Sequence, residues 1–417
     1  MREDAAAESD LAKAGYRDRL LTELAQNAAD AAAREGVEGS LWVDVDGRTL
    51  TVANTGRPLD EPGVHALTAL RASNKVDADE GVTGRFGVGF SAVLSVSDEV
   101  ELRSSTGSIR FSASHTLREI ESRELPVPET GVPPVLRLVW PSGELPSDGA
   151  DSEVVLTLRP DVDAAALLSQ MAREAVDLLL ELPALGSIRL GEKTFRRSER
   201  VLDSGLVEIA IGDRTWWQYT APNARWLVPV RDGVVEPVAD DVLRAPTRSD
   251  EELSIPPAII IADIAMQPDR RRLMPAAPIA PLAEGGYAKF LAALPPRQRT
   301  ALVPIPAFAR SETDSLLREA LLKELQENEW LPVVGEPDRA PQRASVVPGL
   351  GDDLAELLTD IIGGLVVPPS SPAPKHERAL AAVSTHRIGL ARIAELLSGS
   401  EREPKWWNRL YSALEPW

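Results

Sequence analysis

The chain has 417 residues, no cysteine and a formal net charge of −19, from 64 acidic and 45 basic side chains. This acidic balance disfavours a general binder of nucleic acid or of anionic membranes, because both need a large cationic surface. The lack of cysteine excludes a disulfide framework and a thiolate nucleophile, and the four scattered histidines, His65, His115, His376 and His386, show no zinc-ligand spacing.

The N-terminal segment MREDAAAESD is acidic and has no apolar core of the kind that a signal peptide needs. The apolar runs of the chain are too short or too interrupted to cross a bilayer. We therefore expect a cytoplasmic protein that contacts neither membrane nor nucleic acid.

Residues Tyr16–Gly36 are predicted to form an amphipathic helix. At about 3.6 residues per turn, Glu23, Asn27 and Asp30 fall on one stripe, while leucines and alanines occupy other faces that can pack against a sheet. A polar stripe of this kind is most often a solvated helix face. The motifs that follow point instead to a site.

Two short alternating runs come next, Ser40–Val45 and Thr49–Asn54, joined at Asp46-Gly47. Asp-Gly between alternating strands is a strong hairpin signal. The second strand ends in the turn Asn54-Thr55-Gly56 and is followed by a short helix predicted over Glu61–Leu70. This part of the chain therefore contributes a hairpin and a helix.

The polar stretch Arg71–Gly84 has no apolar period and is predicted to be a mobile, lid-like loop. The motif GRFGVGF at Gly84–Phe90 then opens an apolar helix over Val88–Val96. Four strand-like runs follow at residues 99–104, 108–114, 135–140 and 153–159. This order predicts an α+β fold, a mostly antiparallel sheet with helices on one face.

A long helix is predicted over Asp161–Leu182, and we place the first domain boundary in front of it. The predicted domains are residues 1–160, a mixed α/β region over 161–298, and a mainly helical region over 299–417 with proline breaks.

The glycines of Gly84-Arg-Phe-Gly87-Val-Gly89 allow positive φ and close backbone approach, so successive N–H groups can point at a phosphate. Gly87-Val-Gly89-Phe-Ser-Ala92 also fits a dinucleotide-binding turn, but that motif must follow a hydrophobic strand, and DADEGVTGR is no strand. A helix-start turn that holds no ligand is the remaining alternative for this motif.

Three motifs in one order carry a family resemblance. E-x-x-x-N-x-x-D-A at Glu23–Ala31, N-T-G at Asn54–Gly56 and GRFGVGF resemble the nucleotide site of the GHKL (Bergerat-fold) ATPases. The similarity is greatest to the chaperone branch, and more narrowly to bacterial proteins with a sacsin-type N-terminal ATP-binding domain. It covers roughly residues 10–160 and implies a Bergerat-type α/β sandwich that binds ATP and Mg²⁺.

The resemblance implies a role for each matched residue. Glu23 corresponds to the general base that polarises the attacking water, Asn27 to the Mg²⁺ ligand, and Asp30 to a residue that supports the adenine or ribose end. Ser152 corresponds to the hydroxyl residue of the adenine pocket, with Thr157 as the alternative. The remaining matched residues belong to the Gly-rich turn and the lid: Gly84, Phe86, Gly87, Val88, Gly89 and Phe90, and Ser73 and Lys75, which can reach phosphate.

The second motif departs from the family pattern D-x-G-x-G, because Asn54 replaces the Asp and Pro58 the last Gly. The carbonyl of Asn54 can accept a hydrogen bond from the adenine amino group, but its amide nitrogen can equally donate to a guanine oxygen. Adenine remains the expected base. Gly56 keeps its place in the motif.

In several members of the family, the domain after the ATP site supplies a cation to the γ-phosphate. Here Gln267–Leu273 follows an apolar, strand-like run and places Arg270 and Arg271 on a loop at its end. These two arginines are candidates for that sensor, and a solvated basic turn is the alternative.

The predicted function is slow, Mg²⁺-dependent ATP hydrolysis by a chaperone-like protein, in which lid and inter-domain closure couple ATP or ADP binding to a protein client; a homodimer is compatible with this. The alternative is a nucleotide-gated interaction module without turnover. A histidine kinase is disfavoured because no histidine precedes His65, and a DNA-processing enzyme by the acidic balance.

Overall fold

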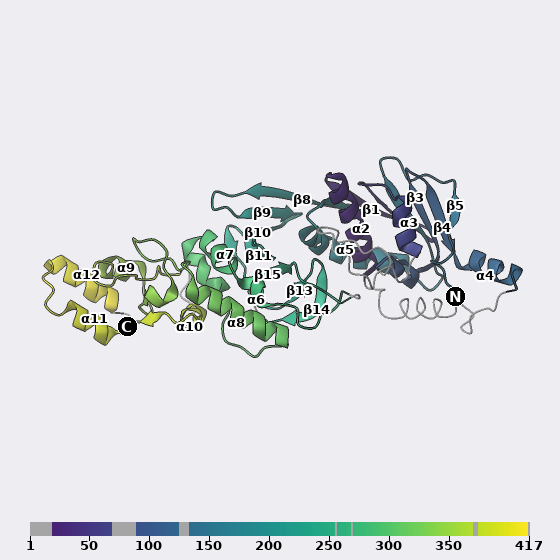
Figure 1. The fold of residues 1–417 in the computed structure, drawn as a ribbon. Helices are drawn as coiled ribbons and strands as arrows, with labels where there is room; N and C mark the ends of the chain where they lie inside the picture. Colours follow the sequence, from purple (N-terminus) through teal and green to yellow (C-terminus); the bar gives the residue numbers. More distant parts are fainter. Residues whose placement is uncertain are drawn as a thin grey trace. The chain divides into compact units, whose positions relative to one another are not determined.

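The computed structural model describes residues 19–68, 89–124, 133–254, 257–267, 270–369 and 374–415. The chain divides into two compact units, Met1–Ser198 and Glu199–Trp417 (Figure 1). No helix in the described ranges combines the length and the apolar character that crossing a membrane requires.

The first unit is built on a mixed sheet with the strand order β8-β7-β1-β2-β6-β3-β4-β5. The pair β1–β7 is parallel, and the other pairs of neighbours are antiparallel. The strands are β1 (Gly39–Asp46), β2 (Thr49–Asn54), β3 (Ser97–Ser104), β4 (Ser108–Ser112), β5 (Trp140–Ser142), β6 (Ser152–Leu158), β7 (Leu185–Leu190) and β8 (Lys193–Val201).

The predicted hairpin is confirmed in β1 and β2. Its register pairs Val43 with Val52 and Asp46 with Thr49. Gly47 has φ 57°, in the left-handed region that a two-residue hairpin turn requires and that glycine adopts without steric cost.

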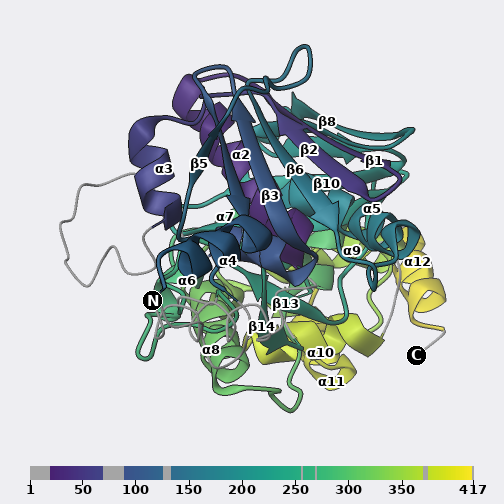
Figure 2. The same cartoon turned by 90° about the vertical axis from the view of Figure 1, so that its right-hand side faces the viewer.

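The helices of this unit are α2 (Leu20–Glu35), α3 (Glu61–Thr68), the 3₁₀ helix η2 (Gly89–Ser95), α4 (Ala113–Ser122) and α5 (Ala164–Glu181). Helix α2 packs against β1, β7 and η2, and α5 packs against β7 and α2 (Figure 2). The predicted fold class, an α+β sandwich with a mostly antiparallel sheet, is confirmed, and its arrangement is consistent with a Bergerat-type fold.

One local prediction is refined and another is wrong. The apolar helix expected over Val88–Val96 is, in its described part, the seven-residue 3₁₀ helix η2. The strand expected over 135–140 is a turn, and pairing begins only at Trp140.

The first unit extends to Ser198, beyond the domain boundary that the sequence predicts at residue 160. Helix α5 belongs to it because the apolar face of this helix, with Met171, Ala175 and Leu178 buried, packs within the first unit. The parallel pairing of β7 with β1 draws the following strand into the same sheet.

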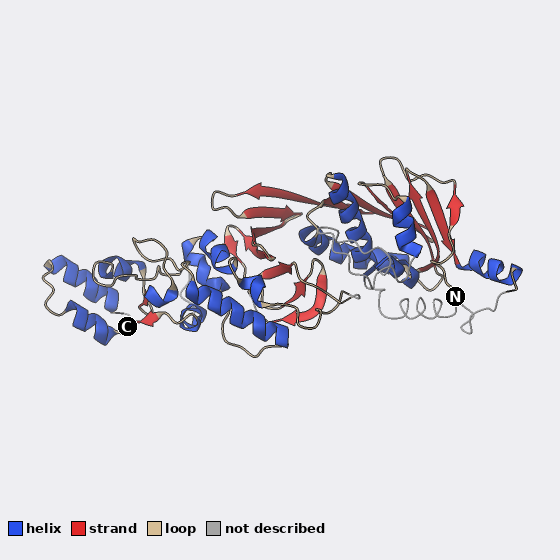
Figure 3. Ribbon diagram, in the orientation of Figure 1, coloured by secondary structure: helices blue, strands red, loops and turns tan. Residues whose placement is uncertain are grey.

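The second unit has its own mixed sheet, with the order β14-β13-β15-β11-β10-β9 and β12 paired to β11. Its strands are β9 (Val207–Ile211), β10 (Arg214–Thr220), β11 (Ala224–Arg231), β12 (Val234–Val235), β13 (Asp241–Arg244), β14 (Arg248–Leu253) and β15 (Ile259–Ala262), and the separate pair β16 (Ser345–Val346) and β17 (His386–Arg387). Its helices are α6 (Ala280–Ala283), α7 (Tyr287–Ala293), η3 (Pro296–Leu302), α8 (Glu312–Glu327), η4 (Pro341–Arg343), α9 (Asp352–Leu358), α10 (Pro374–Ala382), α11 (Leu390–Leu397) and α12 (Pro404–Leu414) (Figure 3).

One core joins the sheet of the second unit to helices on both sides of the boundary that the sequence predicts at residue 298. Trp226 of β11, Tyr287 of α7, Leu321 of α8 and Trp330 are fully buried in it. The predicted mixed and helical regions therefore share a core within this unit. A smaller apolar cluster joins α9, α11 and α12.

Candidate functional site

Helix α2 places the Glu23–Asn27 stripe. Its leucines and alanines, among them Leu20, Leu24 and Ala28, are buried, so the helix is fixed in rotation about its axis. Glu23 is 4% exposed although it carries a carboxylate, and Asn27 lies one turn further along the same side. Glu23 therefore faces the interior of the unit, whereas Asn27 is half-buried.

The carboxylate of Glu23 lies directly against Gly89, the last glycine of the Gly-rich motif. A Cβ atom placed on Gly89 would be 2.0 Å from Glu23 Oε2, so no other residue fits here unless the carboxylate moves. Two motifs that are far apart in the sequence thus meet at one point. Six of the predicted site residues lie outside the described residues: Ser73, Lys75, Gly84, Phe86, Gly87 and Val88.

The sheet forms the floor of a pocket beside this point. Cross-strand pairing places Val52 opposite Val154, and Val154 opposite Leu102, in one apolar row. Two residues further along the same strands, Asn54 pairs with Ser152 in a polar row on the same face of the sheet. The structure therefore brings the predicted residues Asn54 and Ser152 side by side.

The turn after β2 is held against helix α2. Gly56 has φ 124°, and an added Cβ would lie 2.6 Å from the backbone of Ala31, so both the conformation and the space require glycine. The backbone N–H of Arg57 donates to the carbonyl of Ala31 at 2.9 Å. These contacts close one end of the pocket against α2.

A second contact fixes this turn to the sheet. The Asp151 carboxylate accepts a hydrogen bond from the Gly56 N–H at 2.9 Å, and the Asp151 N–H donates to the Asn54 carbonyl at 3.0 Å. The sequence motifs assign no role to Asp151. No local signal could have assigned one, because its partner is 95 positions away.

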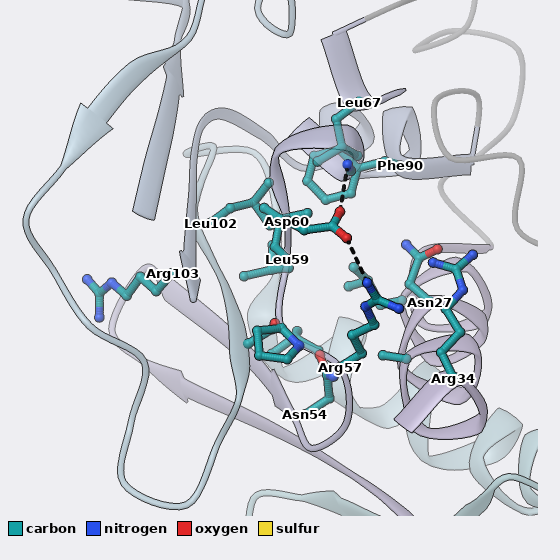
Figure 4. A pocket seen from close by; sticks show the side chains of 17 residues that line it. Asn27, Arg34, Asn54, Arg57, Leu59, Asp60, Leu67, Phe90, Leu102 and Arg103 are labelled. Carbon is teal, nitrogen blue, oxygen red and sulfur yellow. Dashed lines mark hydrogen bonds and ion pairs between the residues drawn. The ribbon is translucent and has the colours of Figure 1, made fainter. Parts of the chain in front are cut away.

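The pocket lies between α2, the sheet floor, α3 and the turn at Asn54–Asp60 (Figure 4). It encloses about 830 Å³, a figure that includes space open to solvent. The described residues that line it are Leu24, Asn27, Ala31, Arg34, Val52, Asn54, Arg57, Pro58, Leu59, Asp60, Gly63, Leu67, Phe90, Leu102, Arg103, Ser152 and Val154.

The polar groups of this lining are arranged around its apolar floor. Partial burial opposes the charge of Arg103, but hydrogen bonding and charge attraction from the Glu101 and Glu153 carboxylates raise its pKa. This guanidinium therefore stays charged, and its charge is already balanced by two carboxylates. The Asn54 side-chain N–H donates to the carbonyl of Thr55 at 3.1 Å, which directs its other end, the carbonyl oxygen, away from that carbonyl.

The remaining predicted site residues are placed as follows. Phe90 lines the pocket from η2, whereas Asp30 is half-buried on α2 and is not among the described residues that line it. Arg270 and Arg271 lie in the second unit, on the predicted loop after β15. There Arg270 has φ 53°, and Arg271 pairs with Asp250 at 3.5 Å.

Pocket residues that the sequence does not single out are Arg34, Arg57, Asp60 and the apolar floor. Arg57 and Asp60 lie one and four residues after Gly56 of the N-T-G motif, and this proximity is the sequence feature that could have identified them.

Comparison with family models finds no match, and comparison with curated proteins finds none either. Among solved structures, the ATPase region of Saccharomyces cerevisiae topoisomerase II matches with 14% identity and a TM-score of 0.32, over 54% of this chain and 60% of that chain. The same region bound to ICRF-187 (dexrazoxane) matches with 14% identity and a TM-score of 0.32, over 55% and 61%. The chain thus spans about 60% of that structure's length, and a likeness this weak indicates nothing about function.

Proposed function

We propose that the first unit binds ATP in this pocket and hydrolyses it slowly with Mg²⁺. The observation that carries the proposal is the contact between the Glu23 carboxylate and Gly89, with Asn27 one turn away in the pocket wall. A carboxylate held against the glycine that ends the Gly-rich motif suits a general base that must lie close to a bound phosphate.

The residues that line the pocket suggest which end of it would hold the base and which the phosphates. The apolar row of Val52, Leu102 and Val154 suits a flat base, and the polar row of Asn54 and Ser152 can hydrogen-bond its edge. The polyphosphate then extends towards Asn27 and Gly89, where backbone N–H groups can hold it. The Asn54 side-chain nitrogen already donates to the Thr55 carbonyl, which leaves its oxygen as the group that can accept from an amino group on the base.

Asn27 fits the role of Mg²⁺ ligand. Its amide oxygen is a hard neutral donor, and the ranges of the chain that the structure describes contain no cluster of three or more His, Cys, Asp or Glu side chains that could hold a metal alone. A cation at Asn27 would therefore depend on phosphate oxygens and water, as Mg²⁺ in nucleotide sites usually does. When bound, the cation would neutralise charge on the phosphates.

Glu23 then accepts a proton from the attacking water. Glu23 and Gly89 are not among the described residues that line the pocket, but Glu23 lies against Gly89, which ends the Gly-rich motif, and this contact supports the assignment of Glu23 to the phosphate end of the ligand. Orienting and deprotonating water in this way contributes about 10²–10⁴-fold to a rate.

We further propose that nucleotide state is coupled to a protein partner, as in the chaperones that the motifs resemble, and that Arg270 or Arg271 contributes to sensing the γ-phosphate. Support for these finer points comes from the sequence motifs. A nucleotide-gated module without turnover is the second candidate, favoured by Asn54, because a neutral amide binds a base more weakly than a carboxylate does.

The test replaces Glu23 by Gln in the full chain. Calorimetry with ATP and ADP, with and without Mg²⁺, should give dissociation constants within about threefold of the parent, whereas the hydrolysis rate should fall about 100-fold or more, because only the base is lost. The matched control is Glu35→Gln, at the exposed end of the same helix, which should change neither.

Equal hydrolysis rates for the parent and Glu23→Gln would contradict the proposal. ATP binding with no turnover in the parent would establish the second candidate in its place.

A further inference from the structure

The pocket has one wall that no predicted site residue occupies. A flat base on the floor of Val52, Leu102 and Val154 would have one face covered by apolar side chains and the other face turned away from the sheet. The question is which side chain can cover that second face.

Arg57 is placed to do so. Its backbone is fixed by the N–H donated to the Ala31 carbonyl at 2.9 Å, while its side chain remains 54% exposed. In Figure 4 the guanidinium reaches from the Asn54–Asp60 turn across the pocket, towards Asn27 and Arg34 on helix α2. Arg57 therefore lines the pocket from the turn, on a different element from the strands of the floor.

The partner of Arg57 holds it only weakly. Its guanidinium lies 3.4 Å from the Asp60 carboxylate, which is 45% exposed. Exposed ion pairs of this kind contribute little, so the guanidinium can shift onto a ligand at small cost. The other carboxylate oxygen of Asp60 accepts the Gly63 N–H at 2.9 Å, which caps the first turn of α3 and anchors Asp60 independently of Arg57.

We propose that Arg57 is a base-binding residue, whose guanidinium stacks on the open face of a purine held against the sheet floor, with Asp60 keeping it at the pocket mouth before the ligand arrives. The inference rests on the proposed nucleotide site. A guanidinium is planar, delocalised and weakly hydrated, so it stacks on flat rings more effectively than an ammonium group. The contact selects for the base and is indifferent to the number of phosphates.

The test measures binding of ATP, ADP and adenosine to the full chain by calorimetry. Arg57→Ala should weaken all three by a similar factor, about fivefold to thirtyfold, because the lost contact is to the base they share. Arg57→Lys, which keeps the charge without the plane, should restore only part of the loss. Arg110→Ala, at an exposed arginine of β4, is the control and should change nothing.

Asp60→Asn separates the contribution of the ion pair to binding from the contribution of the Asp60 helix cap to folding. Asparagine caps a helix as well as aspartate, so α3 and the melting temperature should be unaffected. Because the ion pair is weak, its loss should change affinity for all three ligands by less than about fivefold in either direction. A larger loss would show that the ion pair and not stacking makes the contact matter.

Three further results would overturn the inference: unchanged affinities in Arg57→Ala, a loss confined to ATP and ADP, which would indicate a phosphate contact, or full restoration by lysine. If the parent binds none of the three ligands, the proposed function fails and this inference fails with it.

Discussion

Two groups of polar side chains, one in each unit, differ in what they contact. In the second unit, Arg299 is 7% exposed and donates to the carbonyls of Leu294 and Trp330, both at 2.9 Å, and to the Asp338 carboxylate at 2.6 Å. In the first unit, Asn27, Asn54 and Ser152 converge on the wall of an open pocket.

This difference separates structural polarity from functional polarity. A guanidinium whose N–H groups donate to backbone carbonyls holds loops together, and few of its N–H groups remain to bind a ligand. Polar groups that line a cavity above an apolar floor are what a bound small molecule needs. The half-buried polar residues of the pocket therefore point to a binding site, and the hydrogen bonds of Arg299 to a structural role.

The largest effect is expected at Gly56, where the pocket turn meets α2. Gly56→Ala forces a Cβ to within 2.6 Å of backbone at φ 124°, and should destabilise the first unit by about 3–5 kcal/mol. Gly36→Ala is the control, since Gly36 also has positive φ but open space around it, and should cost only about 1–2 kcal/mol. Hydrogen exchange of peptides from each unit measures both, and equal costs would show that the contact with α2 is unimportant.

Arg299→Met tests the scaffold. The substitution removes three hydrogen bonds and leaves their acceptors without this donor, so the second unit should lose about 2–3 kcal/mol in denaturant unfolding, while ATP affinity stays the same. Arg297→Met breaks an exposed ion pair with Asp352 and should cost about 0–1 kcal/mol. A change in ATP affinity in Arg299→Met would contradict a purely structural role for Arg299.

The smallest effect concerns pH. Burial lowers the pKa of His376, against the opposing charge of Glu377, and its ring is hydrogen-bonded to the Thr300 hydroxyl at 2.7 Å. Because the unfolded state takes up this proton more readily, the histidine lowers stability as pH falls through about 6.5 towards its folded pKa. His376→Gln should therefore lose less stability than the parent between pH 7.5 and 5.5, as measured by thermal unfolding. An identical pH response would refute this.

Local patterns in the sequence predicted the elements that carry the site. The apolar period over Tyr16–Gly36 gave the helix now seen as α2, and Asp46-Gly47 gave the hairpin β1–β2. They also predicted that Glu23 and Asn27 share a face, because helix periodicity alone decides that. What local patterns left open was whether that face meets solvent or protein.

Tertiary structure decided the rest, because it depends on contacts between distant segments. Three contacts follow from how the sheet is assembled. Glu23 lies against Gly89, Asn54 pairs with Ser152, and the Asp151 carboxylate accepts a hydrogen bond from the Gly56 N–H. Periodicity records which side of an element is apolar but not which other element covers it. For the same reason, the sequence predicted the helix at α5 and misplaced the unit to which that helix belongs.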